Sequence, residues 1–457
     1  MAAHALDRHL VLVGFMGAGK STLGPLVAER LGRSFVSVDE VVEKRAGESV
    51  AEIFERHGEA EFRQREEEAA ADVLARKPLG VVELGGGALG SGRTRAALAA
   101  NAFTVHLETS PDEAWERVAG SGRPLALDSD AFRALFEERK PLYESADASA
   151  TDLDGVVLAA GGVRFASHRE LDATAVIADI HVAEVHGIDA ARTVPRGEAA
   201  KTLAEAERLW RGLRVDRTAT LGAIGGGSTT DLVGFVAATY LRGIDWVAVP
   251  STLVGQVDAA IGGKVGIDLP EGKNLVGAFH WPKRTVIDTT LLETLPEEER
   301  RNGLAEVVKT GLLLGEPLWE LGTYAQVRTC AAYKAGICLR DPFDRGDRAQ
   351  LNLGHTFAHA LEAASGYTLS HGRAVALGLL AACRLSDLED EARVVESVLA
   401  PAPVAVDRDA AWAALQRDKK AVEGKIHLVV LEMPGRPALT SEVEPARIRE
   451  ALDALIA

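Results

Sequence analysis

Residues 14–22 contain the most specific chemical pattern in this chain. They read GFMGAGKST, which fits the phosphate-binding pattern G-x-x-x-x-G-K-[ST], and they lie between a strand-like run and a helical one. In such a loop the backbone N–H groups surround phosphates, Lys20 reaches the β- and γ-phosphate oxygens and the Ser21 hydroxyl ligates Mg²⁺. The sequence therefore predicts a nucleotide site. Its expected contacts are Gly17, Ala18, Gly19, Lys20, Ser21 and Thr22.

A second substrate of this region must be bound by residues at other strand ends. Two further predicted strands end at Asp39 and at three glycines that include Gly86. Ligands of parallel α/β sheets lie at the carboxyl ends of strands, so these residues and the phosphate loop are expected to share one cleft. Three arginines of this region are further candidates for binding the substrate: Arg63, Arg123 and Arg139. Taken singly, each is more often a surface charge than a ligand-binding residue.

The region from about Leu10 to Ala148 resembles shikimate kinase. The resemblance is carried by the runs GFMGAGKSTLG, GEAEFRQRE, GGG, RP and ERKPLYE, in that order. It implies transfer of phosphate from ATP to shikimate, with Lys20 catalytic and Ser21 on magnesium. The positions implied to hold shikimate are Asp39, Arg63, Gly86 and Arg139, with Glu66 supporting Arg63. Arg123 would lie on a lid over ATP.

One departure from that family lies beside the predicted site. The family usually has Asp-x-Asp where this chain has Ser37-Val38-Asp39, and the first carboxylate helps to organise the magnesium shell. Serine hydrogen-bonds the metal's water but supplies no charge. Phosphoryl transfer depends mainly on positioning and charge neutralisation, so we expect a weakened but active kinase whose rate an aspartate at 37 would raise. A nucleotide-binding regulatory module is the alternative for this half.

Composition limits the organisation of the whole chain and its partners. A length of 457 residues predicts two or three domains. Asp and Glu outnumber Lys and Arg, 67 to 51, so the net charge of −16 argues against binding to nucleic acid or to anionic membranes. Three cysteines without CxxC spacing are typical of buried thiols in a reducing, cytoplasmic protein. The first apolar run is too short to span a membrane.

Two changes of pattern predict the domain boundaries. An Ala/Asp/Gly-rich segment without long helical periodicity places the first boundary near Gly155, and helical periodicity dominates after Pro296. The expected domains are an α/β P-loop domain with a parallel sheet (1–155), an α/β NAD-binding domain (156–295) and a mostly α-helical metal- and substrate-binding domain (296–457).

The glycine-rich stretch 225–274 is the candidate site of the second domain. Three glycines follow a strand-like run, and such a turn lets backbone N–H groups approach a phosphate at the start of the next helix. Arg242, Lys264 and Lys273 follow or adjoin further glycine turns, as expected for a phosphorylated ligand. Ordinary turns with solvated cations explain the spacing equally well, because GGGS is not the GxGxxG fingerprint. Asp179, at an earlier strand end, is expected to bind a ribose hydroxyl or to cap a helix.

Polar residues at helical spacing characterise the third domain. Intervals of four, three and four separate Arg348, Asn352, His355 and His359. A single helix over RAQLNLGHTFAHALE would place all four on one stripe, which needs partners such as a metal ion and a phosphate if it is buried. Glu306 and Lys309 share a helix face in the same way. A Glu and two His form a common zinc set, for which spacing alone favours His355 with His359.

From about Val156 to the end the chain resembles 3-dehydroquinate synthase. The runs PRGEAAKTL, GGGSTTDLVGFVAATYLRG, VDAAIGGK, PEGKNLVGAF, GLAEVVKTG, HGRAVALG and GKIHLVV carry the resemblance. It implies that Glu306, His355 and His371 bind zinc or cobalt and that His359 is catalytic instead. The implied NAD contacts are Asp179, Glu198, Lys201, Gly226, Gly227, Asp231, Ser251, Thr252, Lys264 and Lys273. Those implied around the sugar-acid phosphate are Arg242, Asp258, Lys264, Lys273, Asn274, Lys309, Lys334, Arg348, Asn352 and Lys425.

The implied substrate is 3-deoxy-arabino-heptulosonate 7-phosphate. A hydride passes from its C5 alcohol to NAD while the metal polarises that oxygen, phosphate leaves, and the hydride returns before the ring closes, so no net redox change appears. The residues expected to handle phosphate and protons are Lys264, Lys309, His359, Arg348 and Asn352. The resemblance also implies a homodimer formed through this half.

Two positions depart from the synthase pattern, and two alternatives remain for this half. Ala358 stands where glycine is common, and His181 lies near the expected adenosine site. The alternatives are a related sugar-phosphate cyclase and a zinc–NAD polyol dehydrogenase. Together the two resemblances predict one chain with two enzymes of aromatic amino-acid biosynthesis, whose steps are not consecutive.

Overall fold

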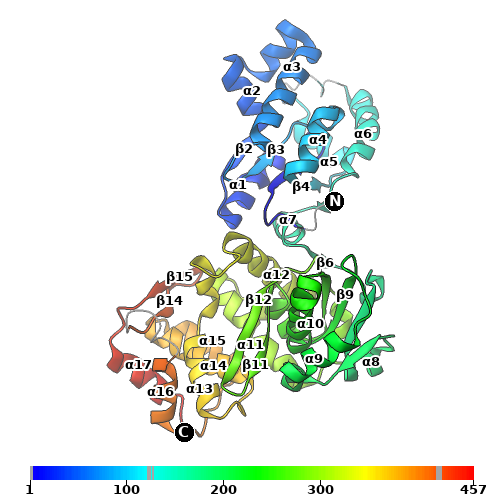
Figure 1. Ribbon diagram of the computed structural model, residues 1–457. Helices are drawn as coiled ribbons and strands as arrows, with labels where there is room; N and C mark the ends of the chain where they lie inside the picture. Colours follow the sequence, from blue (N-terminus) through cyan, green and yellow to red (C-terminus); the bar gives the residue numbers. More distant parts are fainter. Residues whose placement is uncertain (1–3, 121–124, 126–127, 418–424) are drawn as a thin grey trace. The chain divides into compact units, whose positions relative to one another are not determined.

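The computed structural model describes residues 4–120, 125, 128–417 and 425–457. Contacts divide the chain into two compact units (Figure 1). The first unit is Met1–Arg164 with Ala335–Arg340, and the second is Phe165–Lys334 with Asp341–Ala457. Among the described residues, none of the helices has the length and apolar character needed to cross a membrane.

The division after Arg164 lies beyond the boundary expected near Gly155, because a helix occupies that position. Helix α7 (Leu153–Ala160) is capped by the Asp152 side chain, which accepts a hydrogen bond from the Gly155 N–H. Its Val156 and Val157 are fully buried. The segment looked like a linker because it is rich in Ala, Asp and Gly, yet its short apolar run folds into the first unit.

The first unit is built on a five-stranded parallel sheet of order β2-β3-β1-β4-β5. Its strands are β1 (His9–Val13), β2 (Phe35–Ser37), β3 (Val81–Glu83), β4 (Ala102–Leu107) and β5 (Ala148–Ala150). Every residue of β1 is buried, as expected for a central strand covered on both faces. The flanking helices are α1 (Lys20–Leu31), α2 (Val38–Ala46), α3 (Val50–Leu74), η1 (Ala88–Gly90), α4 (Gly92–Asn101), α5 (Pro111–Val118), α6 (Ser129–Tyr143) and α7.

Glycines form the turn between β1 and α1. Gly14 and Gly17 have φ angles of 145° and 84°, in the region that side chains disfavour. A Cβ at Gly14 would lie 2.8 Å from the Leu107 carbonyl oxygen, and one at Gly17 would lie 2.6 Å from that of Ala114. The loop therefore needs glycine both for its backbone conformation and for its close packing.

The second unit begins with a six-stranded sheet of order β6-β13-β10-β9-β7-β8. Its strands are β6 (Val163–Phe165), in which the division between the units falls, β7 (Ala175–Asp179), β8 (Arg192–Val194), β9 (Thr220–Gly225), β10 (Asp245–Pro250) and β13 (Arg284–Ile287). The accompanying helices are η2 (His168–Glu170), α8 (Ile180–His186), η3 (Gly197–Ala200), α9 (Leu203–Gly212), α10 (Gly227–Thr239), η4 (Tyr240–Arg242), the π-helical turn η5 (Gly255–Ala259) and η6 (Thr289–Leu292). The antiparallel hairpin β11 (Lys264–Leu269) and β12 (Gly272–Phe279) packs on α10.

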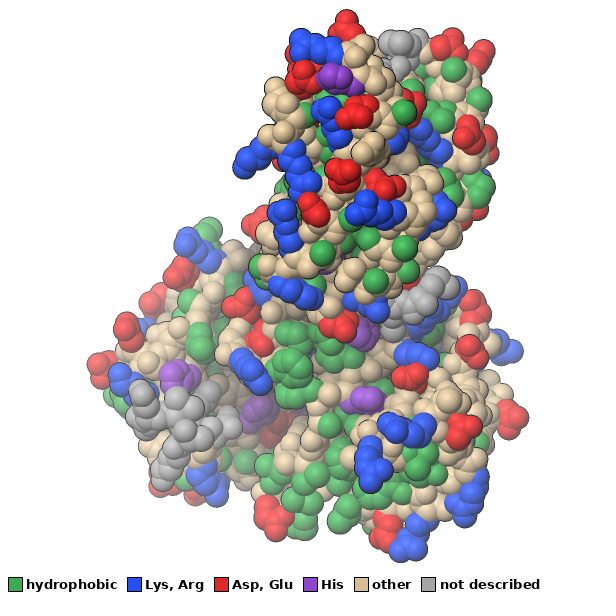
Figure 2. All heavy atoms as spheres, turned by 45° about the horizontal axis from the view of Figure 1, so that its top comes forward, with side chains coloured by type: hydrophobic (Ala, Val, Ile, Leu, Met, Phe, Trp, Pro, Cys, Tyr) green, Lys and Arg blue, Asp and Glu red, His purple; other side chains and the backbone are tan. Residues whose placement is uncertain are grey.

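The remainder of the second unit is mostly helical, as predicted. Its helices are α11 (Glu297–Leu314), η7 (Leu318–Glu320), α12 (Thr323–Arg340), η8 (Asp347–Asn352), α13 (His355–Ala364), α14 (His371–Leu385), α15 (Glu389–Leu399), α16 (Arg408–Arg417) and α17 (Pro445–Asp453). The end of α12, Ala335–Arg340, is counted with the first unit. One antiparallel pair, β14 (Leu428–Met433) and β15 (Arg436–Thr440), completes it. On the face drawn in Figure 2, acidic and basic side chains are interspersed.

The prediction of a single helix over RAQLNLGHTFAHALE is wrong, because two separate elements cover this run. The 3₁₀ turn η8 ends at Asn352, and α13 starts at His355 after Gly354, whose φ is 77°. A Cβ at Gly354 would lie 2.7 Å from the Leu379 backbone nitrogen, so α13 begins in close contact with α14. Arg348 and Asn352 consequently do not share a helical stripe with the two histidines.

Candidate active sites

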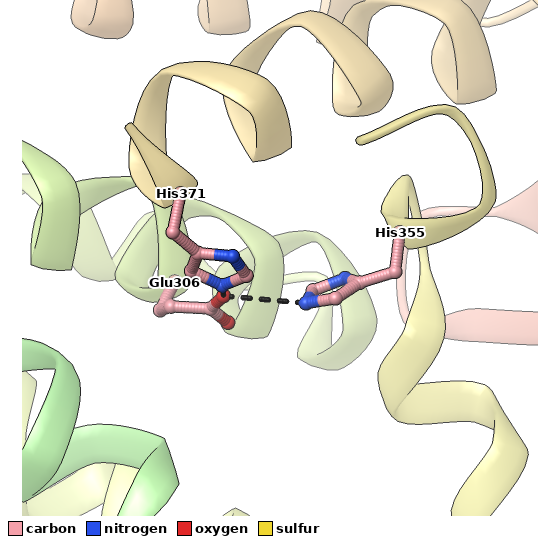
Figure 3. A group of neighbouring side chains, drawn as sticks. All are labelled: Glu306, His355 and His371. Carbon is pink, nitrogen blue, oxygen red and sulfur yellow. Dashed lines mark hydrogen bonds and ion pairs between the residues drawn. The ribbon is translucent and has the colours of Figure 1, made fainter. Parts of the chain in front are cut away.

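Three side chains from separate helices converge in the second unit. Glu306 lies on α11, His355 opens α13 and His371 opens α14. One donor atom from each lies within 4.8 Å of the others. The Nε2 atoms of His371 and His355 lie 3.1 and 3.4 Å from Oε1 of Glu306 (Figure 3). The structure thus brings together the three residues implied to bind the metal, although 65 positions separate the first from the last.

Hydrogen bonds orient both imidazoles. Nδ1 of His355 lies 3.2 Å from the Leu353 carbonyl oxygen, to which it donates, so Nε2 is left to face Glu306. His371 lies between two carboxylates, because its Nδ1 is 3.5 Å from Oε1 of Glu362. Burial alone would favour neutral His371, but its hydrogen bonds to Glu306 and Glu362 outweigh burial and raise its pKa to about 10. The proton on Nε2 of His371 therefore lies between His371 and Glu306, where a metal cation would contact both side chains.

A buried chain of alternating charges extends from Glu306. Lys309 contacts Oε2 of Glu306, and its Nζ also lies 3.3 Å from Oδ2 of Asp258. The other oxygen of Asp258, Oδ1, pairs with Lys334. Burial opposes ionisation of both carboxyl groups. Lys309 and His355 outweigh it at Glu306 and hold that pKa well below its usual range. Lys309 and Lys334 do the same at Asp258, whose pKa falls to about 2.

A cleft of about 1100 Å³ adjoins these residues and includes His371 and His359 in its wall. The predicted cofactor and substrate residues that line it are Asp179, Glu198, Lys201, Gly226, Gly227, Asp231, Ser251, Thr252, Lys273 and Asn274. The N-terminus of α10 begins at Gly227, where its backbone N–H groups favour an anion. Asp179 also caps α8, since it accepts from the N–H groups of His181 and Val182, which confirms the expected helix cap.

Lysine and carboxylate side chains lie together in the wall of this cleft. Buried Lys201 donates to Asp231 over 2.8 Å and also contacts the Asn274 side-chain oxygen. Burial alone would lower the pKa of Lys201, but Asp231 and Glu198 outweigh it and raise that pKa. Glu198 accepts from Ser228 at the start of α10. The wall therefore has fixed donors and acceptors suited to the ribose and phosphate groups of a dinucleotide.

Several predicted residues lie outside the lining of the cleft. Lys264 pairs with Asp344 at 2.5 Å, and buried Arg348 donates to the Gly262 carbonyl over 2.9 Å, beside the turn that delivers Lys264. Lys264 is exposed, and the other exposed residues of the predicted synthase set that do not line the described cleft are Arg242, Asn352 and Lys425. Sequence reasoning missed Glu362 and Asp344, which hold His371 and Lys264.

The first unit places the predicted shikimate residues around the glycines that follow β3. Arg63 donates to buried Glu66 over 2.6 Å. A Cβ at Gly87 would lie 2.4 Å from the Arg63 guanidinium, and one at Gly85 would lie 3.0 Å from Oδ1 of Asp39. The pKa of Glu66 is raised, chiefly by burial, while Arg63 acts in the opposite direction.

The remaining residues of this site lie close by, except one. Tyr143 donates to the Gly86 carbonyl, and Arg139 hydrogen-bonds Tyr143 and favours ionisation of Glu66. Buried Lys20 donates to the carbonyls of Gly14 and Phe15, over 2.8 and 3.0 Å. Arg123 lies outside the described residues.

Fold and geometry thus define a P-loop phosphotransferase unit and a unit with a metal site beside an anion-binding cleft. The shikimate kinase family profile matches residues 16–163, and those of the N-terminal and C-terminal domains of 3-dehydroquinate synthase match 191–302 and 303–421. The bifunctional shikimate kinase/3-dehydroquinate synthase of Thermotoga maritima is 32% identical over 97% of this chain and 100% of its own length. The chain belongs to the family of bifunctional shikimate kinase/3-dehydroquinate synthases.

Other relatives resemble the second unit alone. The 3-dehydroquinate synthase of Symbiobacterium thermophilum is 39% identical over 70% of this chain and 99% of its own length. The 2-epi-5-epi-valiolone synthase of Streptomyces hygroscopicus, solved with NAD⁺ and Zn²⁺ bound, is 25% identical with a TM-score of 0.55, over 64% of this chain and 90% of its own. A 2-deoxy-scyllo-inosose synthase has the same fold, at 24% identity and a TM-score of 0.56, over 64% of this chain and 96% of its own.

Proposed function

We propose that this chain catalyses two reactions of aromatic amino-acid biosynthesis. One is phosphorylation of shikimate by ATP, and the other converts 3-deoxy-D-arabino-heptulosonate 7-phosphate to 3-dehydroquinate and phosphate. The observation that carries the second activity is the convergence of Glu306, His355 and His371 beside a cleft with the N-terminus of α10 in its wall. The phosphate loop and the Arg63–Glu66 pair support the first.

The donor set fits one divalent cation. One carboxylate oxygen and two imidazole nitrogens make three ligands with room for a fourth, which is typical of catalytic zinc and also suits cobalt. A bound zinc or cobalt ion would polarise the oxygen of the substrate alcohol whose carbon gives up the hydride. The chain orients both imidazole donors before a metal binds, since the Leu353 carbonyl orients His355 and Glu362 orients His371.

The cleft fits NAD. The cleft-lining residues that would hold it are Asp179, Glu198, Lys201, Gly226, Gly227, Asp231, Ser251, Thr252 and Lys273. We also propose Lys264, which lies outside the lining, as an NAD contact. NAD supplies a reversible hydride acceptor, and Asp179 at the end of β7 suits a ribose hydroxyl. The N-terminus of α10 suits the pyrophosphate. We propose that Arg242, Asp258, Asn274, Lys334 and Lys425, together with Lys273, bind the substrate.

Charged residues next to the metal donors position the substrate and move protons. Lys309 is held between Glu306 and Asp258, so its ammonium group is fixed where a phosphate oxygen can be bound. His359 lies one turn after His355 on α13, and its exposed ring lines the cleft, where it is placed to exchange a proton with the substrate. Lys264, Arg348 and Asn352 complete the group that we propose handles phosphate.

In the kinase unit, Arg63, Arg139 and Asp39 bind shikimate next to Gly86, with Glu66 fixing Arg63. Lys20 binds the β- and γ-phosphate oxygens after leaving the loop carbonyls to which it donates. Gly17, Ala18, Gly19 and Thr22 contribute to the phosphate loop, and Ser21 to Mg²⁺. The proposal keeps Arg123 as the residue that covers ATP.

Two assays on the full chain test these activities. The synthase must release phosphate from the heptulosonate phosphate without net accumulation of NADH, whereas a polyol dehydrogenase would accumulate NADH. The kinase must form ADP only when shikimate is present, whereas a regulatory module would bind ATP without turnover. The relatives favour the two enzymes over either alternative.

We also propose that the protein is a cytoplasmic homodimer that forms through the synthase unit. The three cysteines are free and buried, which suits a reducing compartment. Light scattering tests the assembly, since a dimer has about twice the chain mass of 48.4 kDa. A mass equal to one chain at micromolar concentration would contradict the dimer.

A further inference from the structure

The hydroxyl that is expected to ligate magnesium already has a carboxylate partner. Ser21, the second residue of α1, donates through Oγ to Oε1 of Glu83, over 2.7 Å. Glu83 is the last residue of β3 and stands at the carboxyl end of the sheet, where ligands of parallel α/β sheets bind. This glutamate belongs to none of the motifs by which the kinase region was recognised.

The strand register places Glu83 beside the position that lacks a carboxylate. Glu83 pairs with Ser37 on β2 and with Leu12 on β1, so it lies between the strand that leads into the phosphate loop and the strand that ends at Ser37. Neighbouring strands are about 4.8 Å apart. A glutamate side chain at 83 therefore reaches the space in front of position 37, where the buried Ser37 side chain supplies no charge.

The contact between Ser21 and Glu83 also suits the chemistry of a metal-bound hydroxyl. A serine that ligates Mg²⁺ must direct a lone pair to the metal and its hydrogen elsewhere. Glu83 accepts that hydrogen and so fixes the hydroxyl in the orientation that a ligand needs. P-loop enzymes commonly pair the loop Ser or Thr with a strand-end carboxylate in holding Mg²⁺, and Glu83 has that position here.

We propose that Glu83 is a positioning residue that replaces, from the neighbouring strand, the carboxylate missing at Ser37 in the magnesium shell of the kinase. The charge is therefore moved within the site instead of being lost. An aspartate at 37 then adds a second carboxylate next to Glu83, so that it strengthens magnesium binding little in the native chain and strongly when Glu83 is neutralised. With Glu83 supplying this carboxylate, we no longer expect the serine at position 37 to weaken the kinase by itself.

Binding of ADP to the full chain, measured by calorimetry with Mg²⁺ titrated in or removed by chelator, tests the proposal without turnover. Glu83→Gln should weaken the Mg²⁺ affinity of the ADP complex roughly 10–100-fold, as removal of a group that orients a metal ligand does. Its affinity for ADP without Mg²⁺ should stay within about twofold of native. Adding Ser37→Asp to Glu83→Gln should restore most of the lost Mg²⁺ affinity, and Glu137→Gln, an exposed change on α6, should have no effect.

Other outcomes would overturn the proposal. Unchanged Mg²⁺ affinity in Glu83→Gln, equal weakening of ADP binding with and without Mg²⁺, or failure of Ser37→Asp to restore the affinity would each do so. Glu83→Asp distinguishes loss of charge from loss of packing at position 83. Because it keeps the charge but shortens the side chain, it should retain more Mg²⁺ affinity than Glu83→Gln. The synthase activity of the same preparations and the thermal unfolding of the kinase unit report whether each variant is folded.

Discussion

Glu362 Oε1 lies 3.5 Å from Nδ1 of His371, on the ring edge away from the Nε2 that faces Glu306. Glu362 is buried, and its own pKa is lowered because His371 outweighs the effect of burial. A carboxylate behind a ligating histidine fixes the ring orientation and raises its basicity as a metal ligand. Glu362 on α13 therefore fixes the ring orientation of His371, the metal-ligand candidate at the start of α14.

Glu362→Gln should weaken zinc binding by roughly 10–100-fold, since the amide keeps the shape but not the charge. Zinc affinity is measured by competition with a chromophoric chelator. Glu450→Gln, at an exposed position on α17, is the matched control and should bind zinc normally. The kinase activity of both variants should stay native. Equal zinc affinity in Glu362→Gln and the control would show that Glu362 does not support the ligand.

Lys309→Met should destabilise the synthase unit by about 3–5 kcal/mol, because it leaves Glu306 and Asp258 buried next to each other without the cation between them. Denaturant unfolding of metal-free protein, followed at the transition of the synthase unit, gives the free energy. The control is Lys283→Met, whose exposed pair with Asp245 should contribute at most about 1 kcal/mol. A similar loss for both lysines would contradict a stabilising role for the buried charges.

Residue patterns predicted the fold class, and the resemblance predicted the three residues that converge, but neither predicted the path of the chain between them. Helical spacing could not reveal that Gly354 breaks the expected helix, because the break results from contact with Leu379 on a different helix. The same spacing favoured His359 as the partner of His355. Only the resemblance nominated His371, which meets His355 through the packing of α13 on α14.

Residues that act through a neighbour were the hardest to predict. Glu362 lies in a helical run where a glutamate is usually an exposed charge, and Glu83 ends a strand outside the sequence motifs of the kinase region. Their roles depend on contacts with other elements, because Glu362 contacts His371 on the next helix and Glu83 contacts Ser21, 62 positions earlier in the chain. A weak signal existed for Glu362, which is three residues after His359 and so shares a helix face with it.

Glu66→Gln should raise the KM for shikimate about tenfold and leave the KM for ATP within about twofold, because it removes the charge-assisted hydrogen bond that holds Arg63. Steady-state kinetics with each substrate varied in turn separates the two constants. Glu59→Gln is the matched control, since Glu59 also pairs with Arg63 but at an exposed position, where an ion pair contributes little. An equal rise in both KM values would indicate general damage to the unit.

Acid should destabilise the synthase unit through Asp288. Burial opposes ionisation of this carboxyl group, but hydrogen bonds from Thr290 and His168 outweigh it and lower its pKa to about 2. The folded pKa lies below that of an unfolded Asp, about 3.9, so the ionised group stabilises the fold above roughly pH 4 and this contribution disappears as the pH falls to about 2. Asp288→Asn should be less stable at pH 6, with the difference from native shrinking below pH 4. A constant difference over that range would contradict the shift.

Metal stoichiometry combined with phosphate release tests the central claim most directly. The purified chain, loaded with zinc and freed of excess, should retain one ion per chain by elemental analysis. It should release phosphate from the heptulosonate phosphate with catalytic NAD and no accumulation of NADH. Glu306→Gln should lose both the ion and phosphate release while its kinase stays active. Retention of the ion by Glu306→Gln, or phosphate release by the metal-free chain, would contradict a site formed by Glu306, His355 and His371.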